Sequence, residues 1–113
     1  MLDTSPLNAA VERFADRLRT VPQSRLQQGA AAVALELARE LSVRAQRLEG
    51  AAEVREMPDA GIFTVGDQVA VAGLDLAEAL RLGAGAGDGA TAPSEVLDEA
   101  VRLVEQAEVR AMR

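Results

Sequence analysis

The chain has 113 residues and a formal net charge of −6, with 18 acidic residues against 12 basic ones, all of them arginine. This length corresponds to one domain, and the acidic balance disfavours non-specific binding to nucleic-acid phosphates. The chain has no His, Cys, Lys, Tyr or Trp, so the usual catalytic bases and the thiol and amine nucleophiles are absent. We therefore expect a protein that is not an enzyme.

The first predicted helix covers residues 6–20. Ser5 supplies a hydroxyl cap, and Pro6 follows it at the first helical position, where the missing N–H has no cost. Apolar residues then recur at helical spacing, which predicts an amphipathic helix. Pro22 ends it, so residues 6–20 and the next helix should form an antiparallel hairpin.

The second predicted helix is the longest, at residues 24–49, and Gly50 is a plausible left-handed stop. Residues 29–38 are apolar on nearly every side, and a helix that is apolar all round is normally buried all round. Shorter neighbours in one chain leave part of this band uncovered, so we expect it to pack against its own copy in a two-fold homodimer. The expected interface consists of Leu26, Gly29, Ala30, Val33, Leu37 and Leu41.

Residues 62–71 are ambiguous between two structures. Two short β-branched runs around Gly66 and Asp67 would suit a small β-hairpin. A helix is favoured instead, because an apolar stripe with helical spacing continues to Leu82 and Asp67 would lie in the first turn, where the helix dipole favours an acid. The third predicted helix therefore covers residues 65–82.

The remaining sequence predicts a linker and one more helix. Residues 83–92 are mostly glycine and alanine, which is typical of a flexible linker. Pro93 then begins a predicted helix over 93–112. The fold class predicted for residues 1–113 is a single all-α domain, an antiparallel bundle of about four helices with one long central helix.

No motif predicts a metal or cofactor site. Carboxylate pairs such as Glu36 with Glu40 sit at helical spacing, but a di-iron bundle site would add a His that the chain lacks. The glycines at 83–89 do not match the spacing of a dinucleotide-binding loop and have no preceding strand. The acidic side chains are best interpreted as solvated helix faces.

The sequence thus predicts a non-enzymatic helical protein–protein interaction module, with itself or another protein as partner and no nucleic acid or membrane. The alternatives are a small-molecule binder with an aliphatic pocket between helices, and a small exported helical effector. Residues 1–50 carry a net charge of +1 and residues 51–113 one of −7, so the halves should attract within or between chains. Absent cysteines and a start unlike a signal peptide favour the cytoplasm. The arginine and alanine bias suggests a bacterium with a GC-rich genome.

Overall fold

The computed structural model describes residues 2–83 and 92–113, and this part of the chain is helical without any strand. The predicted all-α bundle is confirmed, and residues 62–71 form helix, not a hairpin. Residues 84–91, most of the predicted linker, lie outside the described residues. The elements are α1 (Ser5–Thr20), α2 (Gln23–Arg25), the π-turn η1 (Leu26–Ala30), α3 (Ala31–Leu48), the 3-10 turn η2 (Ile62–Thr64), α4 (Val65–Gly83) and α5 (Pro93–Ala111).

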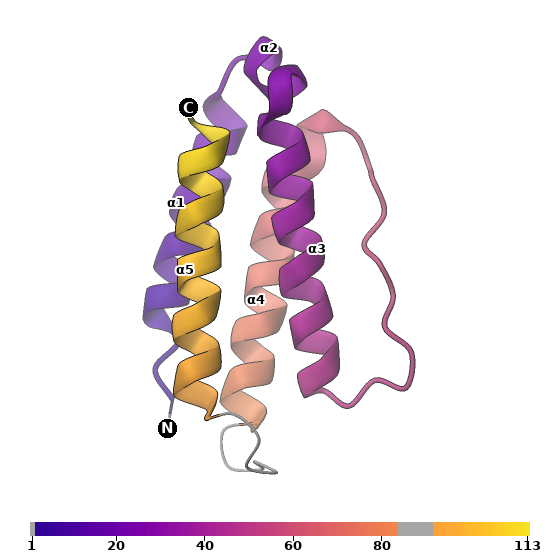
Figure 1. Cartoon of the computed structure of the whole chain (residues 1–113), viewed down its shortest axis with the longest axis vertical. Coiled ribbons are helices and arrows are strands. Elements are labelled where there is room, and N and C mark those ends of the chain that lie inside the picture. The colour runs from indigo at the N-terminus through magenta and orange to yellow at the C-terminus, as the bar shows by residue number, and fades with distance from the viewer. Residues whose placement is uncertain (1, 84–91) are drawn as a thin grey trace.

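The four long helices form a bundle with one long crossover connection (Figure 1). Helix α4 packs against α1 and α3, and α5 packs against the same two helices from the other side, so α1 faces α3 across the bundle. Helices α1 and α5 run in one direction and α3 and α4 in the other, because residues 49–61 cross the length of the bundle between α3 and α4. Four-helix bundles with a single crossover of this kind are a known connectivity.

The second predicted helix is interrupted, which corrects the expectation of an unbroken helix over 24–49. Gly29 has φ 143° and ψ −19°, values outside the helical region, within the π-turn between α2 and α3. An added Cβ at Gly29 would meet nothing within 4 Å, so glycine is needed here for its backbone conformation and not for space. The helix that packs in the bundle is α3, and Leu26 to Ala30 form a separate turn above it.

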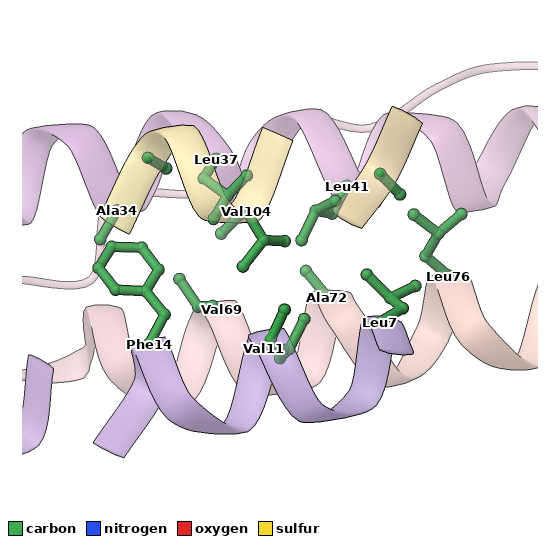
Figure 2. Packing of buried hydrophobic residues seen from close by; sticks show 14 of the residues in the cluster. Leu7, Val11, Phe14, Ala34, Leu37, Leu41, Val69, Ala72, Leu76 and Val104 are labelled. Carbon is green, nitrogen blue, oxygen red and sulfur yellow. The ribbon is translucent and has the colours of Figure 1, made fainter. Parts of the chain in front are cut away.

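The core is aliphatic, as the composition predicts, and Phe14 is its one aromatic ring among the described residues. Figure 2 shows this ring pointing from α1 toward Ala34 of α3, with Val69 of α4 beside it. A large side chain opposite a small one fills the space between two diagonal helices at the density of protein interiors. Further along the bundle, Leu41 and Leu76 are also fully buried.

Two glycines allow α4 to approach α1 closely. A Cβ added to Gly73 would lie 2.6 Å from both methyl groups of Val11, and one added to Gly66 would lie 3.2 Å from the carbonyl oxygen of Ala15. Both positions are on the side of α4 that faces α1, seven residues apart, which is about two helical turns. These glycines therefore have a packing role, although in the sequence they only weaken the helical pattern.

The charges of the two halves attract each other within the chain. Glu108 of α5 is buried and accepts hydrogen bonds from Arg13 Nε and Arg17 Nη1 of α1, each at 3.1 Å. Both arginines are about half exposed, so water still hydrates part of each guanidinium group. The buried carboxylate accepts hydrogen bonds from these two charged donors in place of water. Burying a carboxylate is costly unless it is hydrogen-bonded, and charged donors make the strongest such bonds, so this cluster fixes α1 against α5.

Candidate interaction surface

The interface residues predicted from the sequence do not lie together on an open surface. Leu26, Ala30, Leu37 and Leu41 are buried within the chain, and only Gly29 and Val33 are partly exposed. The inner residues of α3, among them Ala34, Leu37 and Ala38, are covered by α4 on one side and α5 on the other, whereas Ala32 is exposed. In this structure the chain itself therefore supplies the partners that we expected from a second copy.

Exposed apolar side chains gather instead on the outer side of η2 and α4. Four large residues there have high exposed fractions: Phe63 (72%), Val71 (51%), Leu74 (61%) and Leu82 (77%). We call this set the α4 stripe. When a helix has apolar residues on both its buried and its outer side, the monomer leaves the outer apolar side exposed to water.

The spacing of the α4 stripe places its members on one side of the helix. Phe63 and Leu74 are 11 residues apart, and so are Val71 and Leu82. Eleven residues make slightly more than three full turns of an α-helix, so Val71 and Leu82 lie nearly in a line along the axis. Phe63 precedes α4, in the 3-10 turn η2, so it continues the line of Leu74 only roughly. The two lines are adjacent, since Val71 and Leu74 are neighbours at i, i+3.

The stripe is also symmetric about its own midpoint, which lies between positions 72 and 73. The equidistant pairs are Phe63 with Leu82, Val71 with Leu74, and the intervening acids Asp67 with Glu78. A surface of this kind matches a copy of itself rotated by a two-fold axis, because each residue then meets its pair in the partner. Antiparallel contact of two such helices would extend over about 28 Å, at 1.5 Å per residue.

Arg19 of α1 forms an ion pair with Asp67 and so reduces the negative charge at one edge of the stripe. Its Nη2 lies 2.7 Å and its Nε 3.2 Å from Asp67 Oδ1, and its Nη1 lies 3.2 Å from Asp16 Oδ1. The hydrogen bond to Asp67 raises the pKa of the Arg19 guanidinium above its usual value. Arg19 therefore offsets the negative charge of Asp67 next to the apolar residues.

This surface was missed in the sequence, although a signal for it is present. The sequence predicts all-round apolar character for residues 29–38 and a single apolar stripe, continuing to Leu82, for the third predicted helix. Within Val65–Gly83 only Asp67, Asp75, Glu78 and Arg81 are charged, so this helix also has more apolar positions than one buried side requires.

Two further findings concern binding chemistry. Across residues 2–83 and 92–113, no three acidic side chains come close enough together to hold a metal ion. Among the described helices, none combines the length and the hydropathy needed to cross a membrane.

Comparison with protein-family models, with curated proteins and with solved structures gives no match for this chain.

Proposed function

We propose that this chain is a non-enzymatic helical interaction module that self-associates through the α4 stripe. The observation that carries the proposal is the symmetry of the stripe, which makes it complementary to a second copy of itself. The sequence also predicts a second copy of the chain as the partner, but it places the interface on the second predicted helix. The interface proposed here lies on α4. This change follows from burial, because most of the residues first expected at the interface already pack inside the chain.

The proposed dimer places the two α4 helices antiparallel. Val71 of each copy then packs on Leu74 of the other at the centre, and Phe63 packs on Leu82 at each end. The acids Asp67 and Glu78 face each other at intermediate positions, where Arg19, already bonded to Asp67, offsets part of the negative charge. A contact of one helix per copy is small beside the ~1,200 Å² of stable interfaces, so we expect micromolar or weaker association.

Substituting Leu74 with aspartate should abolish self-association and leave the fold intact. Leu74 is exposed, so the charge costs little stability in the monomer, whereas in the dimer it would be buried without a partner. Sedimentation equilibrium from about 1 to 500 μM should show the native mass rising toward that of a dimer. The Leu74→Asp variant should remain monomeric with an unchanged helical circular dichroism spectrum.

Val109 provides a matched control for that experiment. It is a large apolar residue on α5 with an exposed fraction of 60%, against 61% for Leu74, but it lies outside the α4 stripe. The Val109→Asp variant should associate like the native chain. A native chain that stays monomeric at every concentration, or a Leu74→Asp variant that still dimerises, would contradict the proposal.

Cysteine cross-linking tests the antiparallel orientation of the same dimer. Since the sequence has no cysteine, variants Phe63→Cys and Leu82→Cys each carry one thiol. In the proposed dimer residue 63 lies beside residue 82 of the partner and about 28 Å from residue 63 of the partner. Oxidation of the mixed variants should therefore give the mixed disulfide, and each variant alone should give little. Efficient cross-linking of each variant with itself would indicate a parallel arrangement.

A further inference from the structure

A large cavity lies between α3 and the crossover connection, and its lining contains no residue of the α4 stripe. Its volume is about 770 Å³, within the range of small-molecule sites. It is elongated, because the α3 side of its wall extends from Ala31 to Val43, about 18 Å along the helix axis. A site of this shape suits a long, narrow ligand better than a compact one.

The cavity exists because the crossover connection lies along α3 as extended chain held by a few polar contacts. Arg39 Nε donates to the carbonyl oxygen of Met57 at 2.8 Å, and the Gln46 side chain exchanges two hydrogen bonds with the backbone of Arg55. Gln68 of α4 donates to the carbonyl oxygen of Pro58 at 2.8 Å. These contacts hold the backbone of the crossover at side-chain distance from α3, and the small residue Ala32 beneath it leaves the space unfilled.

The chemistry of the lining changes along α3. The end nearest the start of α3 is mostly apolar, with Gln27 beside Leu26, Ala32, Leu35, Ile62 and Val65. Gly29 lies at this end, so the break in the helix at Gly29 shapes its wall.

Toward the middle of α3 the lining becomes mostly acidic, with Glu36, Glu40 and Glu56 beside Arg39, and Val43 and Val54 follow beyond these charges. Arg39 is already engaged, since its Nε lies 2.8 Å from the Met57 oxygen and 3.4 Å from Glu56 Oε1. Glu40 is paired with Arg44 at 2.8 Å, and Glu36 lies 4.0 Å from Arg110. The lining carries four acids, Glu36, Glu40, Glu56 and Asp59, against Arg39. Arg44 and Arg110 pair with two of these acids from outside the lining, which leaves a balance of one negative charge.

We propose that this cavity binds an elongated amphipathic cation, such as a long-chain amine or quaternary ammonium compound. The apolar end removes the alkyl chain from water, and the carboxylates at the middle of the cavity attract the positive group. An anionic amphiphile of the same length would meet these carboxylates, while Arg39 is already bonded to Met57 and Glu56. This proposal does not depend on self-association, because the cavity and the α4 stripe share no residue.

The test compares two probes that share one alkyl chain. Titration calorimetry with dodecyltrimethylammonium and with dodecyl sulfate, each below its micelle-forming concentration, gives the affinity for either head group. We expect the cation to bind about fivefold tighter or more, the effect of a partly exposed charge contact. No binding of the cation, or equal or tighter binding of the sulfate, would overturn the proposal.

Two pairs of variants locate the site. Ala32→Leu fills the apolar end and should weaken cation binding roughly tenfold, whereas Ala9→Leu, at an exposed alanine of α1, should not. The double variant Glu36→Gln with Glu56→Gln should lose the preference for the cation. Its control removes the same charge elsewhere, at Glu12 and Glu105.

The outcomes separate this proposal from that of the dimer. The monomeric Leu74→Asp variant should bind the cation as the native chain does. If Ala32→Leu binds normally, or if both double variants lose the preference equally, the probe binds elsewhere through the overall charge and the proposal is wrong. Circular dichroism at each titration end point verifies that the probe leaves the helices folded.

Discussion

Replacing Leu37 with aspartate is expected to unfold the bundle. Leu37 is buried on the inner side of α3, where Figure 2 places it close to Val104. The change removes a buried leucine, which typically costs about 2–5 kcal/mol through the cavity left behind. It also introduces a carboxylate that is either desolvated or protonated at a further cost. The total approaches the ~5–15 kcal/mol by which a domain of this size is stable.

Circular dichroism and urea unfolding measure this effect. At 25 °C the Leu37→Asp variant should have lost most of its helical signal, while Leu74→Asp should keep it together with a native unfolding midpoint. The two substitutions are identical in chemistry, but Leu37 lies on the buried side of α3 and Leu74 on the exposed side of α4. A folded Leu37→Asp variant would mean that the inner side of α3 is not the core.

This contrast has a consequence for the interface first predicted from the sequence. Leu37→Asp looks like a way to disrupt an exposed surface on the second predicted helix. Because Leu37 is buried, loss of a partner in this variant would report unfolding and say nothing about the surface. Leu74→Asp is the informative substitution, since it changes a residue that only a partner would cover.

The class of fold could be predicted because the helical spacing of apolar residues is clear and the residues that begin and end the helices act locally. Pro22 and Pro93 mark helix boundaries within one or two residues of where the structure has them, since proline acts on its own backbone and the preceding turn. The break at Gly29 was not predicted, because glycine is tolerated in a helix and the sequence does not reveal whether its φ is positive.

The direction of α4 could not be predicted from the sequence either. Residues 49–61 contain turn-forming residues such as Pro58 and Gly61, which fit a compact loop as well as a long crossover. Their path is set by side chains distant in sequence, among them Arg39, Gln46 and Gln68. The cavity between the crossover and α3 depends on that path, so no local pattern indicates it.

The position of the candidate surface depends on how four helices divide their apolar area. The band at residues 29–38 and the helix at 65–83 both carry more apolar residues than one buried side needs. The helix that has neighbours on both sides buries its additional apolar residues. The other helix keeps an exposed apolar stripe. In this bundle α3 buries Ala34, Leu37 and Ala38, whereas α4 leaves Leu74 and Leu82 outside. That outcome is a property of the tertiary arrangement and not of either helix alone.

The two phenylalanines of the chain provide the other large expected effect, because one lies in the core and the other on the α4 stripe. Phe14 has an exposed fraction of 0% and Phe63 one of 72%. Phe14→Ala should destabilise the fold by about 3–5 kcal/mol, since Ala34 opposite is too small to fill the space. At about 4 °C for each kcal/mol, the melting temperature should fall by roughly 12–20 °C.

Phe63→Ala is the matched substitution, with the opposite pattern of effects. Its melting temperature, measured at a concentration where the chain is monomeric, should stay close to the native value because an exposed ring contributes little to the monomer. Its self-association should weaken, since Phe63 packs on Leu82 of the second copy in the proposed dimer. Differential scanning calorimetry and sedimentation equilibrium on both variants separate the two roles. Equal melting temperatures for both variants would contradict the core assignment of Phe14, and native-like association of Phe63→Ala would place the dimer contact away from the α4 stripe.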